Sequence, residues 1–364
     1  MVKWVAISLA MIAGLAATRA DDPLVVAFAD QRTNFFTGRE ATVGVVVRGD
    51  AFDGPLSWML SVGNRPLARG TAAVRHVGPD PTRVDVTLAI PEGRAGIVID
   101  AILTVSLSDG GDRWRGGTTK VVRLFPADPF ADRRRWLESR QIALVDPVGR
   151  TAAAFEAANV PFTPVPADLA IAAIRPPVIV VGEGLSWDER PGLAADLAFV
   201  ASRGVGVLCL GPRAGAMPLP GTADQPGEVV ARSLVLRRAD VVAELDGRLD
   251  WLVWSAAGNT SVSRITVLPD GVAVLVQAGD SPVGWPWLEA TFARREADPP
   301  AGKLVICGLG IVTHWNETPA ARYLFAVLLE RLTRSTPVPP GGDPAAAPPP
   351  ADDPPINPPP ENER

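Results

Sequence analysis

Apolar and polar residues alternate with a period of two along the first third of the chain. Leu56, Trp58 and Leu60 alternate with polar or less buried types, and the same pattern returns over residues 84–90. This period is typical of a strand with one buried face. Similar runs, separated by turn-rich pieces, occur at 43–48, 72–77, 97–107 and 120–125. About seven short strands with no helical pattern among them predict an antiparallel β-sandwich of immunoglobulin or fibronectin type III character.

The pattern changes after the proline-containing segment 125–130, where strands begin to alternate with helices. Residues 142–145 and 178–181 are short apolar strands, and residues 151–158 and 193–202 read as helices. Fully apolar strands are typical of a parallel sheet that is covered on both faces. The second part of the chain is therefore predicted to be a doubly wound α/β domain of the flavodoxin type.

One helix near the end of the folded part has the clearest pattern in the chain. Thr318 can cap it, Pro319 suits its first turn, and apolar residues follow on one face at helical spacing, at Ala321, Leu324, Phe325, Leu328 and Leu332. Residues 337–364 then contain 12 prolines. That composition cannot bury a core, so it predicts a disordered or polyproline-like tail.

The first twenty residues have the features of a secretory signal peptide: Lys3, an apolar run, and small residues before a cleavage site at Ala20. A retained membrane anchor is the alternative, although no stop-transfer pattern follows. The predicted organisation is a signal peptide at 1–20, a sandwich at 21–126, a linker at 127–140, an α/β domain at 141–334 and a tail at 335–364. We expect a secreted or periplasmic, envelope-associated protein without an integral membrane span after cleavage.

Charge and the content of cysteine and histidine limit the classes of ligand that this protein can bind. The net charge of −5 gives no electrostatic footprint for nucleic acid. The two cysteines, Cys209 and Cys307, lie inside apolar runs, where we expect buried free thiols; a disulfide between neighbouring strands is the more demanding alternative. With only His76 and His314 besides, no zinc-ligand spacing exists, and no phosphate-binding loop is found. We therefore expect neither a metal nor a cofactor.

Polar residues follow the predicted parallel strands, where ligands of open α/β sheets bind. They form a mixed rim of Asp146, Glu183, Gly211, Arg213, His314 and Glu317. Two of them, Glu183 and Arg213, are candidate binding residues. A pair of acids, Glu183 with Asp146 or Asp188 with Glu189, also has the residue types used in glycoside hydrolysis, although adjacent acids at a helix start ordinarily complement its dipole.

Two segments resemble class I glutamine amidotransferases. The strand ending in Cys209-Leu-Gly211 is similar to their nucleophile strand, and His314-Trp-Asn-Glu317 is similar to their His-x-Glu before the last helix. Val207 stands where the nucleophile turn needs a glycine, and the His-to-Glu spacing is one residue too long. The resemblance thus implies the fold without the activity. The alternative is a Cys/His-dependent hydrolase or amidase that uses Cys209, His314 and Glu317.

Tryptophans are the remaining candidates for binding. Trp285, Trp287 and Trp315 have the side chain that stacks on sugar rings or partner surfaces, although large aromatics more often fill cores. A third alternative is a surface or oligomerisation module, which needs a contiguous exposed apolar patch.

A wider resemblance covers residues 40–334. It is carried by short phrases at 121–126, 142–147, 284–289, 303–307 and 319–324, which look like the accessory region of bacterial beta-galactosidase-like glycoside hydrolases. In those enzymes a β-sandwich and an amidotransferase-like domain accompany a catalytic barrel, which is absent from this sequence. The resemblance implies an exported, non-catalytic scaffold or binding protein, carbohydrate- or envelope-associated, whose partner is a protein or a glycan.

Overall fold

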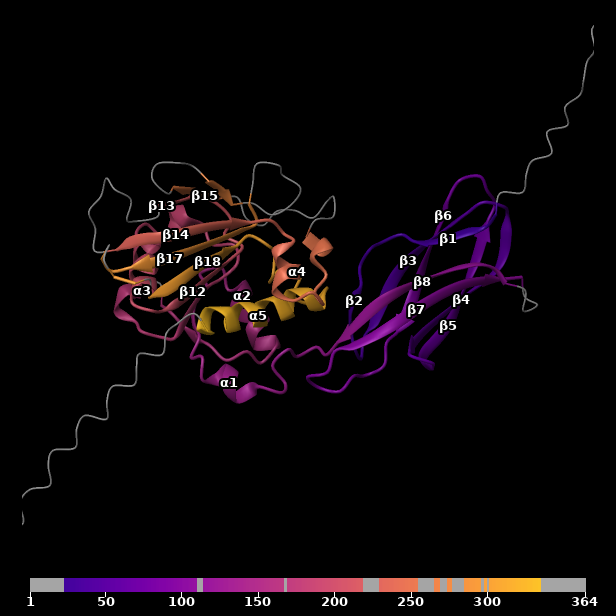
Figure 1. Cartoon of the computed structure of the whole chain (residues 1–364), viewed down its shortest axis with the longest axis horizontal. Coiled ribbons are helices and arrows are strands. Elements are labelled where there is room, and N and C mark those ends of the chain that lie inside the picture. The colour runs from indigo at the N-terminus through magenta and orange to yellow at the C-terminus, as the bar shows by residue number, and fades with distance from the viewer. Residues whose placement is uncertain are drawn as a thin grey trace, which may run out of the picture. The chain divides into compact units, whose positions relative to one another are not determined.

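The computed structural model describes residues 23–109, 114–166, 169–218, 229–254, 265–268, 274–276, 285–295, 298–299 and 301–334 (Figure 1). The chain divides into two compact units, Met1–Ala127 and Asp128–Arg364. They are called the N-terminal and the C-terminal unit below. The predicted signal peptide and the predicted proline-rich tail lie outside the described residues.

The N-terminal unit contains a three-stranded and a five-stranded sheet, ordered β1-β3-β6 and β2-β8-β7-β4-β5. The strands are β1 (Val25–Phe28), β2 (Asn34–Phe36), β3 (Glu40–Arg48), β4 (Phe52–Val62), β5 (Arg65–His76), β6 (Thr82–Ala89), β7 (Ile99–Ser108) and β8 (Trp114–Phe125). One apolar cluster fills this unit, and Val45, Leu56, Leu103 and Leu107 within it are completely buried. The period of two places these residues on inward faces, because successive strand side chains point to opposite sides.

The main sheet of the C-terminal unit has seven strands in the order β10-β9-β11-β12-β18-β17-β14. They are β9 (Ala143–Val145), β10 (Thr163–Pro164), β11 (Val178–Val181), β12 (Gly206–Leu210), β14 (Val230–Arg237), β17 (Trp287–Ala293) and β18 (Gly302–Cys307). The five strands from β10 to β18 are parallel, whereas β17 and β14 are antiparallel to their neighbours. A small second sheet is formed by β13 (Ala216–Pro218), β15 (Ile265–Leu268) and β16 (Val274–Val276).

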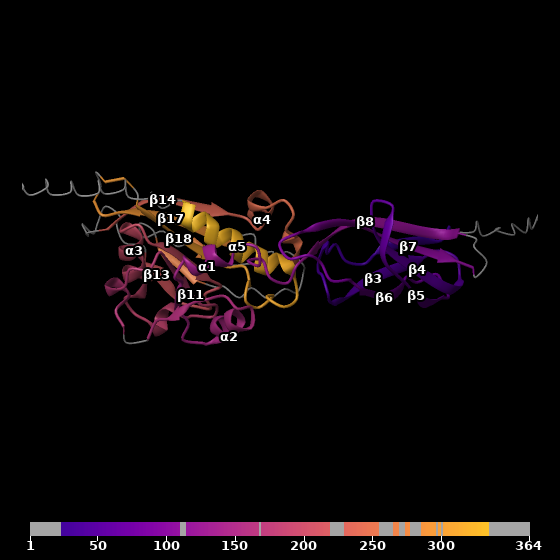
Figure 2. The same cartoon turned by 90° about the horizontal axis from the view of Figure 1, so that it is seen from below.

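The described part of the C-terminal unit contains five α-helices, two of which pack on opposite faces of the seven-stranded sheet. They are α1 (Arg134–Glu138), α2 (Arg150–Ala157), α3 (Leu193–Ser202), α4 (Val241–Leu245) and α5 (Pro319–Arg334), the last of which lies along the sheet in Figure 2. Helix α3 contacts one face, where Val207, Leu304 and Ile306 share its apolar cluster. Helix α5 lies on the other face, since Leu332 packs against Gly206, the residue before Val207.

Helix α5 begins and packs as its sequence predicts. The Thr318 hydroxyl accepts a hydrogen bond from the Ala320 amide at 3.3 Å, and the predicted apolar stripe is buried. The helix is also fastened by charge, because Glu289 of β17 lies 3.1 Å from Arg331 and 3.2 Å from Lys303 of β18. Helix α1 lies within the segment that was predicted to be a linker, residues 127–140. Its Leu137 is buried in the C-terminal unit, which begins at Asp128.

The expected fold class, an antiparallel sandwich followed by a doubly wound α/β domain, is wrong. The chain is rich in β-strands arranged in mixed sheets, with short helices. In the N-terminal unit β2 pairs with β8 in parallel. In the C-terminal unit two antiparallel strands extend the parallel ones, and four of the five described α-helices have ten residues or fewer. Apolar periodicity reports which face is buried, and it contains no information on strand direction.

Candidate functional site

The carboxyl ends of β9, β11, β12 and β18 lie along one edge of the seven-stranded sheet, because the four strands are parallel and adjacent. Asp146 directly follows β9, and Glu183 follows β11 after Gly182. Open sheets with parallel strands bind ligands beyond this edge. The candidate site is therefore built here, from Asp146, Arg150, Thr151, Glu183 and Thr313, which are called the edge cluster.

Glu183 is completely buried and lies at the centre of the edge cluster. Its carboxylate accepts hydrogen bonds from the Val312 amide at 2.7 Å, from the Thr313 amide at 2.9 Å and from the Thr313 hydroxyl. The guanidinium of Arg150 lies 3.9 Å away. A buried carboxylate is stable only when such donors replace water. These contacts fasten the loop after β18 to the end of β11.

Asp146 connects the same edge to helix α2. Its Oδ2 accepts a hydrogen bond from the Ala152 amide at 2.8 Å, and the Thr151 hydroxyl accepts one from the Glu183 amide at 2.9 Å. Gly182 permits this arrangement, since a Cβ there would lie 2.5 Å from Asp146 Oδ1. That Oδ1 atom is buried and has no hydrogen-bond partner in the described part of the chain. Apart from this oxygen, the polar groups of the edge cluster bind one another or neighbouring backbone amides.

Cys209 lies inside β12, paired with Val181 on one side and Ile306 on the other. It is completely buried in the apolar cluster under α3. Burial raises the pKa of its thiol far above the ordinary value, since the thiolate would lose its hydration. A nucleophile needs the opposite environment, with access to solvent and stabilisation of the thiolate. Cys209 is therefore a core residue, as its apolar surroundings predict.

Cys307 lies in the neighbouring strand β18, opposite Leu210 rather than Cys209. Because successive side chains point to opposite faces, this offset of one residue puts the two sulfurs on opposite sides of the sheet. The prediction of two buried free cysteines is confirmed. The pKa of Cys307 is raised to about 12, mainly by burial, with a smaller increase from the charge of Glu183 and a decrease from a hydrogen bond with the Leu309 backbone.

His314 pairs with Glu317 rather than with a cysteine. Its Nδ1 atom lies 2.7 Å from Glu317 Oε2, and the Glu317 side chain is exposed. The next residue, Trp315, packs on Phe155 of α2 and Phe325 of α5, so the loop belongs to the α5 side of the sheet. Cys209 faces the α3 side. The structure therefore brings His314 and Glu317 together and leaves Cys209 out of the group.

The other predicted rim residues, Arg213 and Gly211, have their partners outside the five residues of the edge cluster. Arg213 forms an exposed ion pair with Glu189 at 2.8 Å. Gly211 donates a backbone hydrogen bond to Cys307 and accepts one from Gly184, so it joins strand ends. In the described part of the chain, no group of three or more His, Cys, Asp or Glu side chains is placed to hold a metal ion.

Two of the three candidate tryptophans are core residues. Trp287 is completely buried and donates a hydrogen bond from Nε1 to Glu289 at 2.9 Å. Trp315 is buried between aromatic rings of α2 and α5. Neither ring is available to a sugar or a partner, which corrects their prediction as binding residues. Trp285 is half-buried, and the Arg238 guanidinium lies 4.1 Å from its ring centre.

The sequence did not reveal three members of the edge cluster. Thr151 and Arg150 begin the helix after Asp146, and Thr313 precedes His314, so all three are neighbours of residues that the strand-end argument singled out. Position after a buried strand was thus the useful signal. Their contacts with Glu183 join segments about thirty and 130 residues apart, and no local pattern contains that information.

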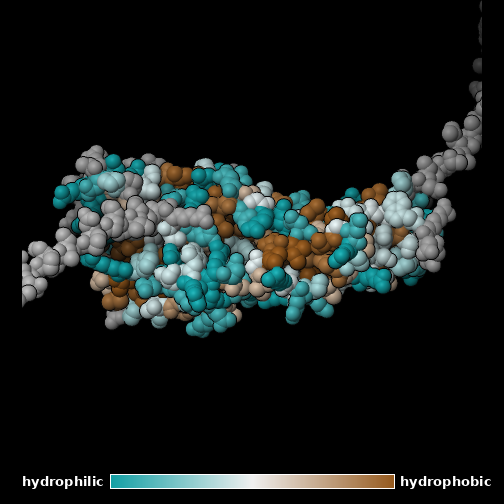
Figure 3. Space-filling model, turned by 60° about the horizontal axis from the view of Figure 1, so that its bottom comes forward, coloured by the Kyte–Doolittle hydropathy of each residue, from teal (hydrophilic) through white to brown (hydrophobic). Residues whose placement is uncertain are grey.

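Apolar side chains are also exposed on the face of the molecule that Figure 3 shows. On the N-terminal unit, Ile102 of β7 and Val121 of β8 are cross-strand partners and are 42% and 57% exposed. Met59 of the next strand, β4, is likewise exposed.

Across the described residues, no helix is long and apolar enough to cross a membrane.

Comparisons with known proteins identify no family. No family model matches the chain, and no curated protein matches it. Solved structures with some likeness include the sporulation control protein Spo0M from Bacillus subtilis, which has 16% identity, covers 32% of this chain and 54% of its own, and has a TM-score of 0.22.

Two carbohydrate-active enzymes are also among these structures. One is a cycloisomaltooligosaccharide glucanotransferase from Paenibacillus sp., with 13% identity and a TM-score of 0.22. The match covers 44% of this chain and 20% of the enzyme. The other is a beta-glucuronidase of glycoside hydrolase family 2, with 9% identity and a TM-score of 0.20. The match covers 52% of this chain and 20% of the enzyme. This chain spans about half of Spo0M and a fifth of the two enzymes. At these TM-scores the likenesses carry no function, and an amidotransferase-like domain is not shown.

Proposed function

We propose that this protein is an exported, non-catalytic scaffold or binding protein. One observation carries the proposal: Cys209, the only cysteine in a nucleophile-like position, lies on the face of the sheet opposite to the loop that contains His314. A base must reach its nucleophile at about hydrogen-bond range. The alternative, a Cys/His-dependent hydrolase or amidase, lacks this geometry.

The edge cluster supports the same proposal. A catalytic carboxylate needs to meet substrate or water, whereas the oxygens of Glu183 are engaged by Val312 and Thr313. This occupancy also weighs against Glu183 and Asp146 as a pair of glycosidase acids, because one of the two is enclosed by protein donors. The edge cluster is thus best explained as a structural element that stabilises the C-terminal unit, whose outer surfaces are then presented to partners.

The thiols provide a direct test. In the native full chain we expect neither Cys209 nor Cys307 to react with a chromogenic disulfide reagent at pH 8, because both sulfurs are buried and protonated. Both should react within the mixing time in denaturant. The measurement is the number of modified thiols with time, followed by mass spectrometry of the peptides.

Two variants serve as matched controls. Ser139→Cys adds a thiol at an exposed position, and Ser186→Cys adds one at a buried position. The exposed thiol should react at least about tenfold faster than the buried one, following its access to solvent. Rapid native modification of Cys209, accompanied by loss of a hydrolytic activity, would remove the non-catalytic proposal.

A glycan or protein partner is the further part of this proposal, and Trp285 is the candidate that retains surface exposure. For a ligand found by glycan array or pull-down, we expect Trp285→Ala to weaken binding by about 1–3 kcal/mol in the range of aromatic hot spots. Trp114→Ala is the control, since this ring is 69% exposed on the N-terminal unit. Equal binding by both variants and the wild type would exclude Trp285 as a contact.

A further inference from the structure

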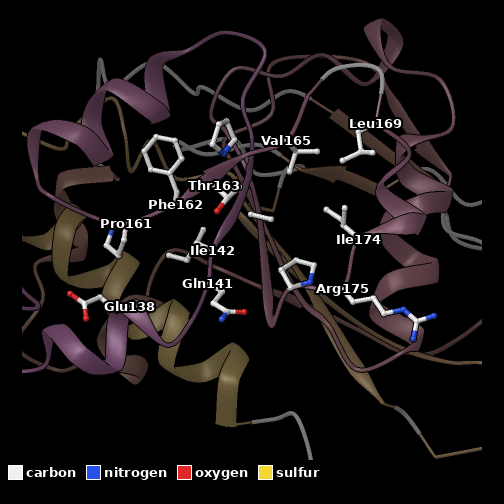
Figure 4. Close-up of a pocket in the computed structure, with 13 residues that line it drawn as sticks. Glu138, Gln141, Ile142, Pro161, Phe162, Thr163, Val165, Leu169, Ile174 and Arg175 are labelled. Atoms are coloured by element: carbon white, nitrogen blue, oxygen red, sulfur yellow. The ribbon is translucent and has the colours of Figure 1, made fainter.

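A groove of about 620 Å³ lies along the outer edge of the seven-stranded sheet. Figure 4 shows Val165, Leu169 and Ile174 gathered at one end, with Glu138 and Gln141 at the other. Arg175 lies at a third side. The groove is mainly apolar with a few polar groups on its rim, which is the usual composition of a binding site.

Strand β10 forms one wall of the groove and is the edge strand of the sheet. The amides of Thr163 and Val165 point inward, where they donate to Ile142 and Leu144 of the β9 segment at 2.8 Å. The outward positions between and after them are Pro164 and Pro166, which have no N–H. A further β-strand therefore cannot form a regular ladder at this edge.

A polyproline segment does not have this difficulty. It lacks N–H groups itself, needs no ladder, and binds through ring packing in apolar grooves and through its carbonyl oxygens. Here Phe162 and Leu169 offer apolar contacts, while the Gln141 amide and the Arg175 guanidinium are exposed donors on the rim. The groove thus matches a proline-rich ligand better than an extended β-strand.

Helix α5 ends close to this groove, as two independent contacts show. Glu330 pairs with Arg133, next to α1, whose last residue Glu138 lines the groove. Leu332 packs against Gly206, whose amide donates a hydrogen bond to Pro177, the neighbour of the lining residue Pro176. The chain therefore leaves the folded unit beside the groove.

The thirty residues after Arg334 have a proline-rich composition, which suits such a groove. They contain 12 prolines, including Pro348-Pro349-Pro350, and five acidic residues against the single Arg364. Asp352 and Asp353 closely follow the triple proline and complement Arg175 in charge. At about 3.1 Å per residue, the segment from 335 to 348 reaches roughly 40 Å, more than enough for a neighbouring groove.

We propose that the proline-rich tail of this chain docks in cis in the groove formed by β10 and residues 169–176, with the segment around Pro348–Asp352 as the occupant. The inference does not depend on the proposed absence of catalysis. It identifies a regulated binding site, since any partner with a proline-rich segment must displace the tail.

Cysteine cross-linking of the full chain tests this docking, with Asp352→Cys paired with Arg175→Cys. The native thiols are buried and do not interfere. We expect an intramolecular disulfide to form at least about tenfold faster than in a control that pairs Asp352→Cys with Arg213→Cys, another exposed arginine of the same unit. Rates are normalised to the reactivity of each thiol with a small disulfide.

A second variant separates docking from chance encounters of the tail. Leu169→Glu changes a side chain that is 39% exposed, so the fold should persist while the apolar groove is lost. It should reduce the rate of the 352–175 cross-link to that of the control. Equal rates for the two cysteine pairs, no effect of Leu169→Glu, or a mainly intermolecular product would each overturn docking in cis.

Discussion

Replacing Glu183 with alanine is expected to lower the free energy of unfolding by about 3–5 kcal/mol, since it leaves buried donors without an acceptor. The Val312 and Thr313 amides and the Thr313 hydroxyl all lose their partner. The loop after β18 should then open locally. Urea unfolding followed at 222 nm measures the loss, because all the α-helices of the described residues belong to the C-terminal unit.

Glu189→Ala is the matched control for this experiment. Glu189 is an acid of the same unit, but its pair with Arg213 is exposed, so its removal should cost less than about 1 kcal/mol. Hydrogen exchange of a peptide covering residues 308–318 adds a local reading. Unchanged protection of the Val312 and Thr313 amides in Glu183→Ala would contradict the fastening of this loop by the carboxylate.

Local physical rules account for the elements that the sequence predicts well. The apolar stripe from Ala321 to Leu332 can face a core only as a helix, and the alternation over residues 84–90 suits only a strand. Both are present as α5 and β6. Strand direction could not be predicted in the same way. The antiparallel strand β17 is as deeply buried as its neighbour β18, which runs parallel to β12. The mixed order of the sheet follows from long-range pairing, which periodicity does not encode.

The candidate site was predictable in position but not in role. A residue after a buried parallel strand must lie at the carboxyl edge, so Glu183 was placed correctly by that argument. Its role depends on amides 129 and 130 residues away, which approach only when β18 pairs with β12. Likewise Trp285 and Trp287 differ by two positions in sequence, yet only Trp287 is completely buried. Burial of an aromatic residue is decided by tertiary packing.

A second large effect is expected at Glu289, which joins β17 to β18 and α5. Glu289→Ala should lower the free energy of unfolding at pH 7 by about 2–4 kcal/mol, somewhat less than for a fully buried pair because Arg331 still reaches solvent. Lys303 and the Trp287 indole also lose their acceptor. Glu244→Ala is the control, since its pair with Arg237 is more exposed and should contribute less than about 1 kcal/mol.

The effect of Glu289 should depend on pH. Burial alone would raise the pKa of this carboxyl, but the Trp287 hydrogen bond and the charges of Lys303 and Arg331 together hold it below its ordinary value. Its stabilisation is therefore complete above the unfolded pKa of about 4.3 and is lost as the pH falls through the folded pKa. Urea titrations from pH 7 to pH 3 should show the difference between wild type and Glu289→Gln shrinking below about pH 4. A difference that stays constant over this range would show that Glu289 stabilises the protein by packing rather than by charge.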